Sequence, residues 1–332
     1  MDLEFHYYIT YLIAAKAGFD PEKALIIAYS SQYVDDNDKI FRIKNKISDN
    51  FYQNYISQTM NITMPQVKLK RIYPLFHFIP GDYEEQSEKL IVEPPKLITT
   101  PDSQNANQII NLALSSKNLY RIGIACHSYT DTWAHQNFVG ASNEFNSFNN
   151  WDDQIIPNIG HADVGHKPDR LNLIWHDYRL KSPQVNNQTR FLAAAESIFR
   201  KLKLCLDPKL SKEILKLEVN DLINDLKKVI IKNQIREERI KAYQKLAKQE
   251  KYGNQKLPKY NKDLWFNQAI KEELPQLEID LFFKKIYPLE DFNNYHWRDD
   301  KSYKTTNWYQ FQEAIKKHQE VAELVLKEVL NK

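Results

Sequence analysis

The sequence predicts an all-α, mainly helical protein, and three observations support this fold class. Glycine and proline are few, 7 and 14 of 332 residues, whereas a many-stranded sandwich or barrel needs frequent turns. Apolar residues recur at spacings of three and four, which is the helical period. Hydrophobic residues make up 42% and charged residues 27%, as in an ordinary globular protein. We therefore expect long helices and little sheet.

The first two helices are expected over residues 5–17 and 21–36. The first segment is apolar and aromatic, and Gly18 follows it as a natural C-terminal cap. The tripeptide Asp-Pro-Glu at 20–22 is a typical helix start, because Asp caps free N–H groups and Pro fits the first turn. This second helix places Asp35 near its end.

The middle of the chain is expected to be mixed. Prolines interrupt residues 37–100, which predict loops with short helices or strands, and we expect the apolar segment at 73–80 to lie against the core. Residues 104–139 predict one or two helices. Residues 140–185 are rich in Asn, Gly, Pro and Asp, so they predict a long functional loop with short helical turns.

The C-terminal part is expected to be helical and basic. Helices are predicted over 191–204, 211–250 and 307–330, with a linker at 252–262. Residues 1–180 carry 16 Lys and Arg against 21 Asp and Glu, a net charge of −5, whereas the remainder carries +8. We interpret the basic part as solvated helix surface rather than a coiled-coil arm, because no heptad pattern persists. Contact with an anionic partner is the alternative.

Two regions follow from this division, a metal-binding catalytic core at 1–185 and a helical extension at 186–332 packed on it. One continuous domain is the alternative.

Two cysteines cannot build a disulfide framework. The start of the chain carries acid where a signal peptide carries base, and no apolar run approaches a membrane span. We therefore expect a cytoplasmic protein, with signal-independent secretion as the alternative.

The strongest chemical signal is the segment His-Ser-Tyr-Thr-Asp-Thr-Trp-Ala-His at 127–135. In a helix, His127, Asp131 and His135 share one face, because residues four apart stack on successive turns. Their neighbours are apolar or aromatic, so this face is expected to point inward. Burying such a row is costly unless a cation or a hydrogen-bonded polar seam satisfies it. A metal site is the leading interpretation.

A second signal lies in the loop at 160–169, where His161, Asp163 and His166 stand among glycines that let the backbone bend around a ligand. A flexible polar loop is the alternative. His6 and His77 are weak signals alone, because a single histidine on an apolar segment is more often a satisfied core residue. Taken in chain order, however, these residues form a specific pattern of imidazoles and carboxylates.

That order resembles the zinc-dependent phospholipase C and single-strand nuclease superfamily, over about residues 1–180. The phrases that carry the resemblance are Ala-Tyr-Ser-Ser-Gln-Tyr-Val-Asp at 28–35, His-Ser-Tyr-Thr-Asp at 127–131 and Gly-His-x4-His-x-Pro-Asp at 160–169. The chain looks closer still to a bacterial branch of that superfamily without an assigned function. The resemblance implies a helical core that holds a three-zinc cluster, extended here by an additional helical region.

The ligands that this resemblance implies are histidines and aspartates. In chain order they are His6, Asp35, His77, His127, Asp131, His135, His161 and either Asp163 or His166. One metal takes Asp35, His77, His127 and Asp131, a second takes His6 and shares Asp131, and a third takes the remaining ligands.

Three departures from the family pattern bear on the number of metals. His135 comes four residues after the aspartate rather than six, Gly165 stands where the family has its last carboxylate, and no Trp begins the chain. Asp2 or Glu4 is a substitute oxygen ligand. A two-metal site is therefore the alternative to three. Iron or manganese can replace zinc, because mixed nitrogen and oxygen ligands do not decide the metal.

The resemblance also implies a metal-dependent hydrolase of phosphoric esters that activates water. Asp131 bridges the metals, Asp36 or Asp163 orients the nucleophile, and Arg170 with Arg179 are candidate phosphate clamps. The substrate classes are a phospholipid headgroup, a nucleotide and a small phosphoester. The acidic N-terminal half argues against long nucleic acid, which needs a basic track.

Two other functions compete with this hypothesis. The doublet His176-Asp177 suggests an HD-type phosphohydrolase, although it lies in an aromatic, loop-like stretch. Alternatively, the metal is purely structural, and the protein is a non-catalytic, metal-stabilised helical interaction protein that works through its basic C-terminal half.

Overall fold

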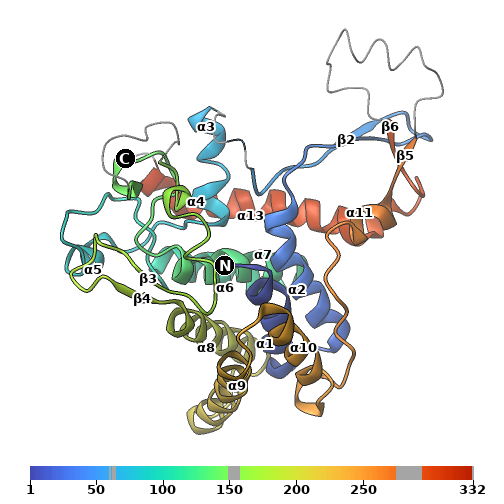
Figure 1. Cartoon of the computed structure of the whole chain (residues 1–332). Coiled ribbons are helices and arrows are strands. Elements are labelled where there is room, and N and C mark those ends of the chain that lie inside the picture. Colours follow the sequence, from blue (N-terminus) through green and yellow to red (C-terminus); the bar gives the residue numbers. More distant parts are fainter. Residues whose placement is uncertain (60, 62–64, 149–157, 274–293, 331–332) are drawn as a thin grey trace.

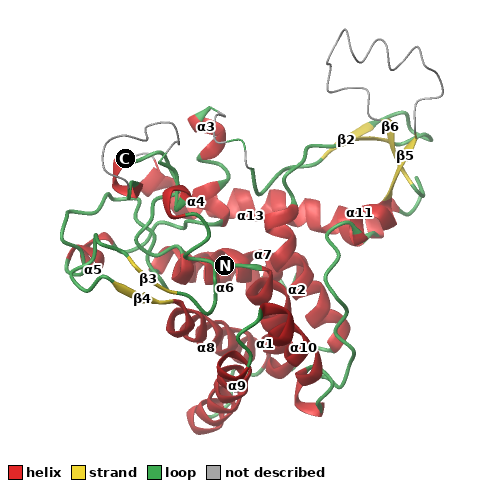
Figure 2. Ribbon diagram, viewed as in Figure 1, coloured by secondary structure: helices red, strands yellow, loops and turns green. Residues whose placement is uncertain are grey.

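Helices dominate the computed structural model, which describes residues 1–59, 61, 65–148, 158–273 and 294–330 (Figure 1). Figure 2 shows two small groups of strands at the edges of this helical body. The prediction of a mainly helical protein is confirmed, whereas the all-α class is not strictly met, because two small sheets are present. In the described part of the chain, no helix is long and apolar enough to cross a bilayer.

The chain begins with a buried π-helix, Glu4–Ile9, that runs directly into helix α1 (Thr10–Ala17). Helix α1 ends at Gly18, whose φ of 115° lies in the left-handed region that favours glycine. Helix α2 (Pro21–Asp36) follows. The helical segment from Glu4 to Ala17 and helix α2 agree with the predicted ranges 5–17 and 21–36. The residues between them, Gly18 and Asp20-Pro21, set these helix ends through their own backbone preferences.

Helix α7 (Leu119–Ala134) lies at the centre of the molecule. It contacts α2, α6 (Gln104–Ser115), α8 (Asn187–Leu206) and α13 (Asn307–Leu330). Its residues 122–134 are all buried. A Cβ atom on Gly123 would lie 2.4 Å from the carbonyl oxygen of Ile27, so α7 and α2 cross at a distance that only glycine permits. This close crossing brings the end of α2 toward α7.

The C-terminal region continues with α8 (Asn187–Leu206), α9 (Lys212–Lys232), α10 (Arg236–Leu246) and the 3₁₀ turn Glu250–Tyr252. The expectation of one helix over 211–250 is wrong. Asn233 and Ile235 have extended backbones, and they break the segment between α9 and α10. As a result α10 packs against the N-terminal π-helix.

Two small sheets join distant parts of the chain. Strands β1 (Arg42–Lys44), β2 (Phe51–Gln53), β5 (Ile270–Glu273) and β6 (Asn294–Trp297) form a sheet in the order β2-β1-β6-β5. Only its β1–β6 pair is parallel. Strands β3 (Ile174–His176) and β4 (Gln184–Asn186) form a hairpin within the segment expected to be a loop.

The remaining elements are mostly short. They are α3 (Gln66–Leu69), α4 (Tyr73–Phe76), α5 (Tyr83–Ser87), α11 (Leu264–Ala269), the 3₁₀ turns Glu144–Asn146, Ala162–Val164 and Tyr303–Thr305, and the long helix α13 (Asn307–Leu330). The main hydrophobic cluster draws on residues from Met1 to Leu326. The core therefore runs without interruption across the expected boundary at residue 185.

Candidate metal centre

Helix α7 carries the residues at the middle of the site. His127 and Asp131 lie one turn apart on its buried face, and His135 caps its C-terminus one turn later. Asn118 caps the other end by accepting a hydrogen bond from the Arg121 N–H at 3.0 Å. The predicted row of ligands is therefore present and faces inward.

Three groups of side chains each bring their ligand atoms within 4.8 Å of one another. The first contains His6, His127 and Asp131, the second Asp35, His77 and His127, and the third His135, His161 and Asp169. His127 belongs to two groups, so these two are adjacent. Each group has the geometry to hold a metal ion.

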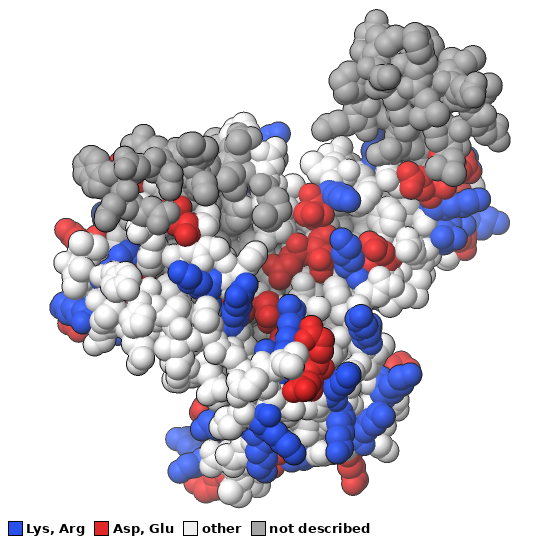
Figure 3. All heavy atoms as spheres, in the orientation of Figure 1, with Lys and Arg blue, Asp and Glu red and all other residues white. Residues whose placement is uncertain are grey.

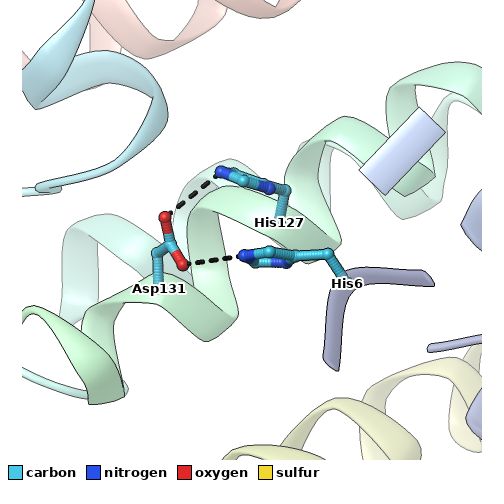
Figure 4. A group of neighbouring side chains, drawn as sticks. All are labelled: His6, His127 and Asp131. Atoms are coloured by element: carbon cyan, nitrogen blue, oxygen red, sulfur yellow. Dashed lines mark ion pairs between the residues drawn. The ribbon is translucent and has the colours of Figure 1, made fainter. Parts of the chain in front are cut away.

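Asp131 lies among the three groups. Its Oδ1 atom is 3.1 Å from His6 Nε2, and its Oδ2 atom is 3.2 Å from His127 Nε2 (Figure 4). Oδ2 also lies 3.3 Å from His77 Nδ1 and 3.6 Å from His135 Nδ1. One carboxylate therefore contacts histidines of every described group, as expected for a bridging ligand.

Distant parts of the sequence supply the other ligands. His6 comes from the π-helix, Asp35 from the last turn of α2 and His77 from the residue that caps α4. The loop around the 3₁₀ turn Ala162–Val164 adds His161 and Asp169. The apolar segment at 73–80 lies in the core as predicted, with its Leu, Phe and Ile side chains buried. Its burial brings His77 to α7.

Backbone carbonyls orient three of the imidazoles from outside the site. His77 Nε2 lies 2.9 Å from the carbonyl of Ser57, His135 Nδ1 2.7 Å from that of His77, and His161 Nδ1 2.8 Å from that of Gly165. A carbonyl only accepts hydrogen bonds, so each of these nitrogens carries the proton. In a neutral imidazole, the opposite nitrogen then has a free lone pair.

Those opposite nitrogens face carboxylates. His135 Nε2 lies 3.0 Å and His161 Nε2 3.3 Å from the carboxylate of Asp169. A lone pair repels a carboxylate unless a cation or a proton lies between them. Within the described residues, His6 Nε2 is buried and has no hydrogen bond of good geometry. The donor set and this unsatisfied nitrogen therefore fit a bound cation.

Burial controls the protonation of the site. It lowers the pKa of His6 and of His161 to about 4, so both imidazoles are neutral at pH 7. It raises the pKa of Asp35 to about 8. Burial alone would also raise the pKa of Asp131, but the Met1 ammonium and the surrounding imidazoles lower it well below its usual value.

The α-amino group of Met1 also lies in the site. It contacts Asp131 Oδ1 and lies 3.3 Å from Asp169 Oδ1. Burial alone would lower the pKa of this amino group, but the two aspartates raise it to about 11. An ammonium group therefore lies between Asp131 of the first group and Asp169 of the third. Sequence reasoning considered Asp2 and Glu4 at this position and missed the amino group.

Two loop residues are not where they were expected. The carboxylate of Asp163 accepts a hydrogen bond from the Phe148 N–H at 3.2 Å and belongs to none of the three groups. His166 is 79% exposed, with Nδ1 3.7 Å from Asp169 Oδ2. Asp169 instead completes the third group. The turn at 162–164 and the left-handed Gly165, with φ of 57°, set which carboxylate points inward.

The residues that the sequence suggested as catalytic, other than those in the groups, also lie elsewhere than expected. Asp36 accepts hydrogen bonds from Tyr260 at 2.7 Å and Gln32 at 3.2 Å, and it faces a different cavity from Asp35. Arg170 is exposed and does not line the cavity that contains His77, His135 and Asp169. Arg179 forms a two-point ion pair with Asp177 and covers phenylalanine rings. Neither arginine is placed as a phosphate clamp.

The arrangement of His176 and Asp177 does not fit the HD-type alternative. Asp177 is fully buried and paired with Arg179, whereas His176 is exposed on β3. In the described part of the chain, neither residue belongs to a group able to hold a metal.

The three groups open on one cavity of about 520 Å³. Tyr73, Phe78 and Ile159 form its apolar wall, and Asp2 and Asp38 add acidic groups at its edge. Among the described residues that line it, none is Lys or Arg. Figure 3 shows acidic side chains gathered near the middle of this face and basic ones toward α9 and α10. The described lining is therefore rich in carboxylates.

The sequence matches DUF6765, a family of unknown function, over residues 1–326. No curated protein and no solved structure is significantly similar to the chain. Because the match spans nearly the whole sequence, the chain belongs to this family.

Proposed function

We propose that this member of the DUF6765 family is a metal-dependent hydrolase of phosphoric esters that uses two or three zinc ions. The observation that carries the proposal is the convergence of three adjacent His/Asp groups on Asp131, with imidazole lone pairs that face carboxylates. Iron and manganese remain alternative metals, since the ligands are mixed nitrogen and oxygen donors.

The ligand assignment supports the expected resemblance to the zinc-dependent phospholipase C and nuclease superfamily. Asp35, His77 and His127 would hold one ion, and His6 with Asp131 a second. A third group, His135, His161 and Asp169, has the aspartate in place of the expected Asp163 or His166. Bound divalent cations supply a water of lowered pKa and stabilise negative charge on phosphoryl oxygens.

The protein's own residues prepare the site for this chemistry. The carbonyls behind His77, His135 and His161 fix the tautomer of each ring and keep a lone pair on the inner nitrogen. Buried surroundings keep His6 and His161 neutral at pH 7. These imidazoles are thus oriented or kept neutral before a cation arrives, which lowers the cost of binding it.

The cavity favours a small phosphoester or a lipid headgroup or nucleotide over long nucleic acid. Its volume of about 520 Å³ suits a small ligand. A nucleic-acid channel would need a row of lysines and arginines to neutralise phosphates, and the described lining contains none. The open cavity also favours catalysis over the alternative of a structural metal, because structural sites are closed by protein ligands.

The test is elemental analysis of protein purified without chelator, followed by assays on p-nitrophenyl phosphomonoesters, phosphodiesters and p-nitrophenyl phosphocholine. The purification tag is placed at the C-terminal end, because the Met1 amino group is buried in the site. We expect two or three metal equivalents and hydrolysis that EDTA abolishes and zinc restores. Stoichiometric metal without turnover of any ester would instead favour the metal-stabilised interaction protein, and absence of metal would contradict both functions.

A further inference from the structure

We propose that Arg239, on helix α10, is a positioning residue for the metal centre. Its ion pair with Glu4 holds the N-terminal π-helix in the register that points His6 at Asp131. This inference rests on the proposed function, since it gives Arg239 a role in metal binding. It also assigns a task to part of the basic C-terminal region, which lies outside the ligand groups.

The contact between Arg239 and Glu4 is bidentate and buried. Arg239 Nε donates to Glu4 Oε1 at 2.7 Å, and Nη2 donates to Oε2 at 2.9 Å. Tyr243, one turn further along α10, donates to Oε1 at 2.9 Å. The carboxylate of Glu4 has no exposed surface. Both its oxygens are thus committed to α10, and Glu4 is not the oxygen ligand considered from the sequence.

Arg239 also binds the turn that precedes its own helix. Its Nη1 atom donates to the carbonyls of Gln234 at 2.8 Å and Asn233 at 3.3 Å. All three of its nitrogens therefore make hydrogen bonds, and the guanidinium joins the π-helix to the break between α9 and α10. This planar, fully used fork fixes direction as well as distance, which a lysine ammonium does not.

The π-helix is held from two sides. Glu4 and His6 are two residues apart, so their side chains leave a helical segment in nearly opposite directions. Glu4 points to α10, whereas His6 lies against α7, with its ring stacked on that of His127 at a centroid distance of 3.9 Å. A shift of Glu4 along or around the helix axis therefore moves His6 away from Asp131.

The hydrogen bonds of the His6 ring itself are weaker than those of Glu4. His6 Nδ1 is 3.5 Å from the hydroxyl of Ser31 on α2, at the limit of a hydrogen bond, and Nε2 has no hydrogen-bond partner among the described residues. A π-helical turn is itself rare and is less favourable than an α-helix, so it persists where its surroundings impose it. A buried ion pair adds little net stability over an apolar pair of equal size, but its geometry specifies one register. We therefore assign the Glu4–Arg239 pair to placement of His6.

The experiment measures Co²⁺ binding to the metal-free full-length protein by chelator competition and by the cobalt absorption spectrum. The variants are Arg239→Met, Arg239→Lys and Tyr243→Phe, and each is also followed by thermal unfolding without metal. We expect Arg239→Met to lower the affinity for Co²⁺ about 10- to 100-fold and to alter the spectrum, with Arg239→Lys and Tyr243→Phe intermediate. If Arg239→Met does not fold, the two milder variants decide the result.

The matched control is Lys203→Met, which removes an ion pair between α8 and α9, Lys203 Nζ to Glu218 Oε2 at 2.8 Å. It is expected to lower the unfolding temperature while keeping the affinity and spectrum of the wild type. If the Arg239 variants behave like this control, the positioning role is wrong. If the wild-type protein itself binds no Co²⁺, the proposed function fails instead.

Discussion

At the scale of single residues, His127 is the candidate ligand with the widest effect, because it belongs to two of the three groups. We expect His127→Ala to lose at least one metal equivalent and the hydrolase activity, since both groups fall to two ligands. Metal analysis after gel filtration checks this. His296→Gln is the control, because His296 pairs with Glu273 on the small sheet. Full metal content in His127→Ala would contradict the assignment.

The raised pKa of Asp35 predicts that metal binding releases a proton from this residue. Burial raises its pKa to about 8, so in the metal-free protein it holds a proton at pH 7, whereas a cation needs the carboxylate. Binding at pH 7 should therefore release about one proton from this residue, and less above pH 8. Calorimetry in two buffers of different ionisation enthalpy measures the release. The Asp35→Asn variant should lack this contribution to proton release. A binding heat that is the same in both buffers for the wild type would contradict the prediction.

The sequence identifies most of the residues in the three groups, and the exception is informative. His127 and Asp131 follow from helical spacing, because a helix repeats regularly and its polar face can be read directly. The third carboxylate does not, since a loop has no such period. Asp163 and Asp169 are the same residue type in the same loop, so the sequence does not distinguish them. Only the folded turn between them determines that Asp169 joins the third group.

At the scale of secondary structure, the crossing of α2 and α7 depends on Gly123. A Cβ atom there would lie 2.4 Å from the Ile27 carbonyl, so Gly123→Ala should push the helices apart. We expect a loss of about 1–3 kcal/mol in the free energy of unfolding, measured in urea, and a lower metal content because Asp35 moves with α2. Leu112→Ala, at an exposed position of α6, is the control. Equal stability and metal content would contradict this role.

Helix boundaries set by local caps were predictable, whereas those set by distant contacts were not. Gly18 and the Asp-Pro pair at 20–21 mark their boundaries through their own backbone preferences. The break between α9 and α10 has no glycine or proline, and contacts of α10 with the N-terminal π-helix accompany it. Strands of three or four residues are too short to show a period.

At the scale of the whole molecule, metal binding should stabilise the fold. The ligands come from the π-helix, α2, the end of α4, α7 and the loop at 161–169, so a cation joins segments that otherwise separate on unfolding. At a free metal concentration of 100 times Kd, the gain is about 2.7 kcal/mol. Differential scanning fluorimetry with EDTA and then zinc should show the unfolding temperature rise. His127→Ala should respond less, and an unchanged wild-type temperature would contradict the linkage.

The relation between the two expected regions could not be predicted, because it depends on long-range pairing. β1 pairs in parallel with β6, which joins Ile43 to Tyr295. The main hydrophobic cluster likewise includes side chains on both sides of residue 185. A pattern read along one chain segment does not contain such pairings. The division into a core and an extension therefore stays a prediction about function rather than about packing.

The Glu4–Arg239 pair has a consequence for the order of events on the ribosome. The two residues are separated by 235 positions, so Glu4 leaves the exit tunnel long before its partner is synthesised. Translation at about 5–20 residues per second leaves an interval of at least ten seconds in which His6 is unanchored. We therefore expect nascent chains that stop before α10 to capture cations poorly, and the centre to be loaded late in biosynthesis.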